Sequence, residues 1–159
     1  MESVLEKLSS YNIFNNLLPG VMFVIFAKQF TNINLVQEDV FIAAFLYYFI
    51  GLIISRVGSL VLEPLLIKIG LIKYASYEKY VAISAKDPKL DILNETNNMF
   101  RTMATLFIFI LGAKVYDQII SSYPKLESIQ FYFWSISLFL LFLFSYWKQS
   151  KYITKRINS

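Results

Sequence analysis

Four apolar runs separated by polar segments dominate the chain, and each run is long enough to form a membrane helix. The runs cover about residues 11–30, 39–58, 102–120 and 129–147 of the 159 residues. A helix rises ~1.5 Å per residue, so runs of this length approach the ~30 Å thickness of a bilayer's hydrocarbon core. We therefore expect an all-α polytopic membrane protein, built as one domain with four transmembrane helices.

Small residues form a stripe along the second run. Gly51, Ser55 and Ser59 recur every four residues, and Gly58 lies beside them. Small side chains let a neighbouring helix backbone come close, which matters in lipid because no hydrophobic force draws the helices together. The stripe predicts a helix-packing or oligomer interface.

Charge enters at the end of the same run. Arg56, Ser59 and Glu63 are spaced i, i+3, i+7 and share one helix face, yet two turns separate the guanidinium from the carboxylate. We therefore expect both ionised groups to meet polar groups on other helices. For Arg56 two interpretations remain open: an anchor at the membrane surface, or a contact with another helix or subunit.

Prolines interrupt the first run and follow the second. The first run reaches membrane length only if it includes Pro19-Gly20, so we expect a broken first helix. Such a break either lines a ligand or ion site, as in some transporters, or only starts or kinks the span. Pro64 is expected to kink or stop the second helix, unless neighbouring helices satisfy the carbonyl that it leaves free.

Basic residues predict the topology. They concentrate in residues 56–101 and in the tail after Trp147, and both regions should be cytoplasmic, which gives an N-in, C-in arrangement. Residues 68–98 then form a cytoplasmic helical connection. Its exposed residues either face a soluble protein partner or touch lipid head groups. The candidates for a partner-facing surface are Tyr74, Tyr77, Lys79 and Tyr80.

Composition excludes most chemistry. The chain is 57% hydrophobic and contains no cysteine and no histidine, so disulfides, the usual zinc sites, thiol nucleophiles and imidazole acid–base groups are absent. We expect no enzyme activity, no catalytic residues, no metal and no cofactor. The net charge of +4 reports membrane topology, so direct nucleic-acid binding is not expected.

Two function classes stay open after the enzymes. One is an oligomeric membrane scaffold, sensor or effector that passes a signal between the bilayer and a cytosolic partner. The other is a small ion channel or transporter subunit. A transporter should carry several polar residues at mid-membrane, whereas the third and fourth runs offer only threonines and serines there. The first class is therefore favoured.

Two short motif sets resemble small four-span membrane proteins of bacterial anti-phage defence systems, of the type of the Kiwa membrane subunit. The first set is Tyr11-Asn12-Ile13-Phe14-Asn15 leading to Leu18-Pro19-Gly20, and the second is Gly51, Ser55-Arg56, Gly58-Ser59 and Glu63-Pro64. The resemblance covers the first two spans. It implies a homo-oligomer, a tetramer, in the bacterial inner membrane that senses infection or membrane disturbance and works with a soluble cytoplasmic partner.

Overall fold

Helices make up nearly all of the computed structural model, which describes residues 13–84 and 86–158. The prediction of an all-α chain is confirmed for these residues, and they contain no strand. The first two residues of the predicted first span lie outside the described part. The helices are α2 (Leu18–Phe30), α3 (Val40–Val57), α4 (Glu63–Lys68), α5 (Tyr77–Ser84), α6 (Lys89–Ser122) and α7 (Gln130–Ile157), with π-helical turns η1 (Ile13–Leu17) and η2 (Gly58–Leu62) and the 3-10 turn η3 (Pro124–Ile129).

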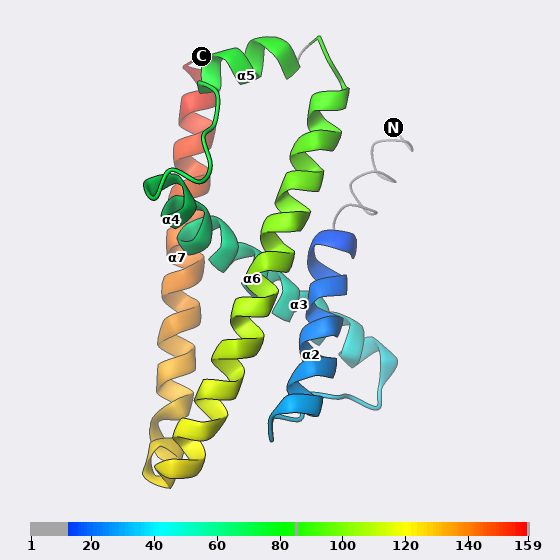
Figure 1. The fold of residues 1–159 in the computed structure, drawn as a ribbon, viewed down its shortest axis with the longest axis vertical. Coiled ribbons are helices and arrows are strands. Elements are labelled where there is room, and N and C mark those ends of the chain that lie inside the picture. Colours follow the sequence, from blue (N-terminus) through cyan, green and yellow to red (C-terminus); the bar gives the residue numbers. More distant parts are fainter. Residues whose placement is uncertain (1–12, 85, 159) are drawn as a thin grey trace.

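Two long helices, α6 and α7, form an antiparallel hairpin joined through η3 (Figure 1). Helix α3 runs obliquely across this hairpin, from the side of α2 to the side of α7. It contacts α2, α6 and α7, and α2 also packs on α6. Helix α5 lies next to the end of α7 (Figure 1). Because α3 runs obliquely, it contacts each of the other longer helices, α2, α6 and α7, at a different point along its length.

Three helices are long and apolar enough to cross a membrane: Val40–Lys68, Lys89–Ser122 and Pro124–Ile157. They correspond to the second, third and fourth predicted spans. None of the residues of α7, all of them described, is buried inside the chain. An apolar helix with no buried side suits a lipid solvent, so the membrane class predicted from the sequence agrees with the structure.

Glycines set the closest approach in the bundle, where α2 and η1 meet α3. A methyl group on Gly51 would lie 1.6 Å from the carbonyl oxygen of Asn16, and one on Gly20 would lie 1.7 Å from that of Tyr47. Backbone therefore touches backbone, and only glycine fits at either position. Gly20 thus allows α2 to pack closely against α3 within the chain.

Pro64 does not stop the second helix, which continues to Lys68. The turn η2 precedes it, and the N–H of Glu63 bonds to the carbonyl of Gly58, five residues back. Pro19 likewise follows a π-helical turn, η1. A proline lacks the N–H of the usual helical hydrogen bond, and a π turn is a common way for a helix to absorb such an irregularity.

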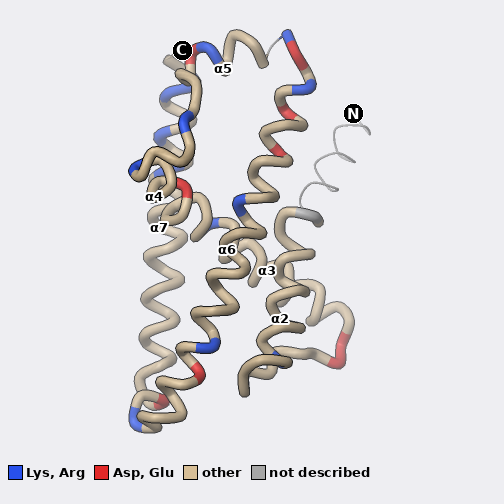
Figure 2. The backbone as a smooth tube through the Cα atoms, in the orientation of Figure 1, with Lys and Arg blue, Asp and Glu red and all other residues tan. Residues whose placement is uncertain are grey.

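Charged residues gather at one end of the bundle, the end that carries α5, the start of α6 and the last turns of α7 (Figure 2). We call it the basic end, since most lysines and arginines lie there. The opposite end carries the acidic loop before α3 and a few charges near η3. Arg56, Glu63 and parts of the 68–98 segment, which the sequence singled out, lie close together at the basic end.

Candidate functional site: a basic cavity at the end of the bundle

The turn η2 creates an unsatisfied carbonyl, and a lysine from another helix satisfies it. In a regular helix the N–H of Glu63 would bond to the carbonyl of Ser59, but here it bonds one residue further back. The ammonium of Lys148, on α7, donates to the freed Ser59 carbonyl at 2.6 Å and to the Ser59 hydroxyl at 2.8 Å. A neighbouring helix thus rescues the irregular turn before Pro64.

Glu63 joins three helices through its carboxylate. Its Oε2 accepts from Nη1 of Arg101 on α6 at 2.8 Å and lies 3.5 Å from Nζ of Lys148. The three side chains are only 13%, 17% and 22% exposed, in the order Glu63, Arg101, Lys148. Ion pairs shielded in this way are screened little by salt. Glu63 thus meets polar groups on other helices.

A network of uncharged polar side chains continues from this cluster into the bundle. Asn15 donates to the Ser55 hydroxyl at 3.2 Å, and the Thr102 hydroxyl lies 3.0 Å from Oδ1 of Asn15. Asn16 donates to the hydroxyl of Tyr48 at 3.2 Å. Asn15, Ser55 and Thr102 are buried. Because each makes a hydrogen bond, the network ties η1 to α3 and α6 without an unpaired polar cost.

The predicted small-residue stripe lies in this region and packs against helices of the same chain. Ser55 and Gly51 are buried under η1, and a methyl group on Gly58 would lie 2.6 Å from Oγ1 of Thr105 on α6. Ser59 belongs to the Lys148 contact. The stripe therefore brings α3 and η2 close to η1, α6 and α7 within one protomer.

The Glu63 cluster and the polar network line a cavity of about 700 Å³, which we call the basic cavity. Among the described residues that line it, four are cations, contributed by α3, α6 and α7, and Glu63 is the only acid. The polar network forms its inner wall and the segment before α5 forms its rim. The lining residues used below are Asn15, Ser55, Arg56, Glu63, Arg101, Lys148 and Lys155.

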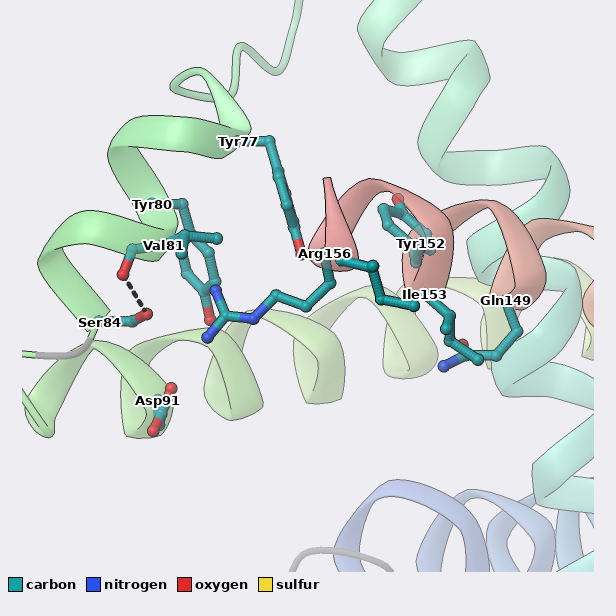
Figure 3. Close-up of a pocket in the computed structure, with 10 residues that line it drawn as sticks. Tyr77, Tyr80, Val81, Ser84, Asp91, Gln149, Tyr152, Ile153 and Arg156 are labelled. Carbon is teal, nitrogen blue, oxygen red and sulfur yellow. Dashed lines mark hydrogen bonds between the residues drawn. The ribbon is translucent and has the colours of Figure 1, made fainter. Parts of the chain in front are cut away.

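Helix α5 docks on α7 through a lysine. Nζ of Lys155 lies 3.6 Å from the carboxylate of Glu78 and 4.7 Å from the centre of the Tyr77 ring. Figure 3 shows Tyr77 and Tyr80 extending from α5 toward α7, where they line a second, shallower cavity of about 590 Å³. Both tyrosines are therefore partly covered by the chain's own helices, and they also line the basic cavity.

The other two predicted partner-facing residues lie differently. Tyr74 is exposed, although its hydroxyl accepts from the amide of Asn97 on α6 at 3.3 Å. Lys79 is exposed and lines neither of the two cavities. Lys79 is therefore accessible at the surface of the described chain.

Two groups of α5 have shifted pKa values. The pKa of Glu78 is lowered, first by a hydrogen bond from its own backbone N–H and then by the positive charge of Lys155. The pKa of Tyr80 is raised, first because the phenol is partly buried and then by the negative charge of Asp91. At neutral pH the carboxylate is therefore charged and the phenol protonated, which favours the docking of α5.

Sequence reasoning missed the residues that complete the site. Arg101 and Lys148 counted only as topology markers, and nothing in their local sequence pairs them with Glu63, 38 and 85 residues away. Asn15 and Asn16 carried a signal, because two adjacent amides at the start of an apolar run are costly in lipid unless they find partners. In the described ranges, no three acidic side chains approach one another as a metal site requires.

No protein-family model matches the chain, and neither a curated protein nor a solved structure does. The basic cavity, its ion pairs and the helices that carry them are therefore the features that point to a function.

Proposed function

We propose that the chain crosses the bacterial inner membrane four times, with both ends and the basic end of the bundle in the cytoplasm. Helix α2 and the turn η1 together cover residues 13–30, about 27 Å of helix at the usual rise. They pack against α3 and α6 as a fourth member of the bundle. The charge asymmetry supports the orientation, since cytoplasmic loops of membrane proteins are enriched in lysine and arginine.

We propose that this protein is an oligomeric sensor, effector or scaffold subunit that couples the membrane to a cytosolic partner. The observation that carries the proposal is the Glu63 carboxylate, which ties the helices of the second, third and fourth spans together beside α5. A tilt or shift of any one of these helices changes the ion pairs and hence the base on which α5 docks. A cluster of this kind suits transmission between bilayer and cytosol.

The partner would contact the outer face of α5, where Lys79 is exposed. The oligomer, a tetramer by the resemblance to anti-phage membrane subunits, would need a face other than the small-residue stripe, because helices of the same chain cover that stripe. The lipid-facing side of α7 offers such a face, since no residue of α7 is buried within the protomer.

An ion channel is the alternative function, and the interior of the protomer supports it less. Below the polar network the buried side chains are apolar, namely Val24, Ala27, Leu106 and Ala113, except for Thr105, whose hydroxyl donates to the carbonyl of Arg101. The described residues therefore offer no polar path through the far half of one bundle, and a pore would have to form between chains. Flux of ions into liposomes that contain the purified protein would favour this alternative.

Purification from membranes in mild detergent tests the main proposal. We expect a stoichiometric soluble protein to accompany the wild-type oligomer and to be lost from Lys79→Glu. The control is Lys125→Glu, which makes the same charge change in η3 at the opposite end. A bare oligomer, or equal recovery of the partner with both variants, contradicts the proposal. If the signal is phage infection, as the resemblance implies, Lys79→Glu also removes protection in a phage plating assay.

A further inference from the structure

The basic cavity contains more positive than negative charge close to its partly buried centre. Arg56, Arg101 and Lys148 line it from α3, α6 and α7, and Glu63 is the carboxylate that faces them. The fourth cation, Lys155, lies near the rim and is engaged by Glu78. Withdrawing cations from water is unfavourable unless negative charge compensates them. The centre of the cavity therefore favours a further anion.

Hydrogen-bond donors remain available for such an anion. Lys148 directs its ammonium to Ser59 and Glu63, so its three donors have partners. Arg101 bonds Glu63 through Nη1, and its buried Nε finds no partner within the described chain. Among the described residues, none makes a hydrogen bond or an ion pair with the guanidinium of Arg56. Within the described part of the chain, the guanidinium of Arg56 and the nitrogens of Arg101 other than Nη1 thus have no hydrogen-bond partner.

The position, size and chemistry of the cavity suit one class of ligand. A volume of about 700 Å³ is in the usual range for small-molecule sites. Guanidinium groups present planar forks of donors that match phosphate oxygens. In the proposed orientation the cavity lies at the cytoplasmic surface, where basic pockets between membrane helices bind the phosphates of lipid head groups.

We propose that the basic cavity binds a phosphate-bearing group, held by Arg56 and Arg101 and balanced against the Glu63 ion pairs. The group is either the head group of a phospholipid or a soluble phosphate compound, because both present the same oxygens. The membrane setting of this inference rests on the proposed function, whereas the binding itself depends only on the cavity.

The test measures thermal unfolding of the purified full-length protein in two settings. In the first, inorganic phosphate is titrated in detergent at constant ionic strength, with chloride as the matched anion. In the second, the protein is placed in phosphatidylcholine nanodiscs with and without phosphatidic acid. The variant is Arg56→Gln, and the matched control is Lys68→Gln, which removes one exposed positive charge at the same end outside the cavity.

We expect a higher unfolding midpoint for wild type and Lys68→Gln in at least one setting. Arg56→Gln should bind about tenfold more weakly or worse, as for a lost hydrogen bond to a charged group. Arg56→Lys, which keeps the charge but loses the fork, should bind with intermediate strength. A shift with inorganic phosphate assigns a soluble compound, and a shift with phosphatidic acid alone assigns a lipid.

The proposal is overturned if neither setting raises the midpoint, or if Arg56→Gln responds as strongly as wild type. These results do not depend on the partner measurement described above. Loss of the partner in Lys79→Glu leaves the phosphate titration unchanged, and absence of phosphate binding leaves partner recovery unchanged. The two proposals therefore fail separately.

Discussion

Replacing Gly51 with alanine tests the backbone contact between η1 and α3. The new methyl group would lie 1.6 Å from the carbonyl oxygen of Asn16 and 2.6 Å from its carbon, whereas ordinary contact begins at 3.4 Å. Both neighbours are backbone atoms, so no side-chain rotation can relieve the clash. The two segments must therefore separate by about 2 Å at this point.

The cost follows from what the separation disturbs. Overpacking of a well-packed site costs about 1–3 kcal/mol of unfolding free energy. The move also stretches the 3.2 Å hydrogen bonds from Asn15 to Ser55 and from Asn16 to Tyr48. Such bonds average about 0.6 kcal/mol each between membrane helices. We expect Gly51→Ala to lower the unfolding free energy by about 2–4 kcal/mol in total.

Gly112→Ala is the matched control, because a methyl group on Gly112 meets nothing within 4 Å. Gly112 lies inside α6, where alanine stabilises a helix by about 0.5–1 kcal/mol relative to glycine. Loss of helicity on denaturation in detergent, followed by circular dichroism, measures both variants. Equal midpoints for the two alanine variants would refute the account of the crossing.

Three further predictions concern the charged groups of the basic end. Glu63→Gln leaves two partly buried cations uncompensated and should lower the unfolding free energy by about 2–4 kcal/mol. The control Glu38→Gln, at an exposed position, should lower it by less than about 0.5 kcal/mol. Equal losses in the two variants, measured by the same denaturation, would argue against the cluster. Lys155→Gln should speed hydrogen exchange in α5 at neutral pH, whereas Lys151→Gln, whose ammonium lies over Trp147, should not. Because the folded pKa of Glu78 is lowered, its contribution to docking is present above the ordinary carboxyl pKa and is lost only as the pH falls through the lower folded value, so wild-type α5 should loosen only in acid.

The length of the apolar runs was enough to predict the membrane class. Three of the runs became helices of spanning length, since hydrophobic length is a local property of the chain. The path through Pro64 was harder to predict. A proline interrupts the hydrogen-bond ladder in any helix, but whether the chain stops or makes a π turn depends on a donor from elsewhere, here Lys148.

The site itself depended on contacts that a single sequence does not reveal. The sequence singled out Glu63 and Arg56 as polar contacts at the membrane interface, yet the partners of Glu63 come from helices that the oblique path of α3 brings together. The tyrosines of α5 illustrate the same limit. Their spacing indicates an amphipathic helix but not which neighbour its face covers, and the structure turns Tyr77 and Tyr80 toward α7.

Cysteine accessibility in intact cells tests the central claim, a four-span protein with its basic end in the cytoplasm. The chain has no cysteine, so single cysteines can be introduced without background. We predict that Gln37→Cys and Lys125→Cys react with a membrane-impermeant maleimide from outside. Ser3→Cys and Lys73→Cys should react only after the membrane is permeabilised. Labelling of Ser3→Cys from outside would contradict the crossing of the first span, residues 11–30, and labelling of Lys73→Cys from outside would contradict the orientation of the basic cavity.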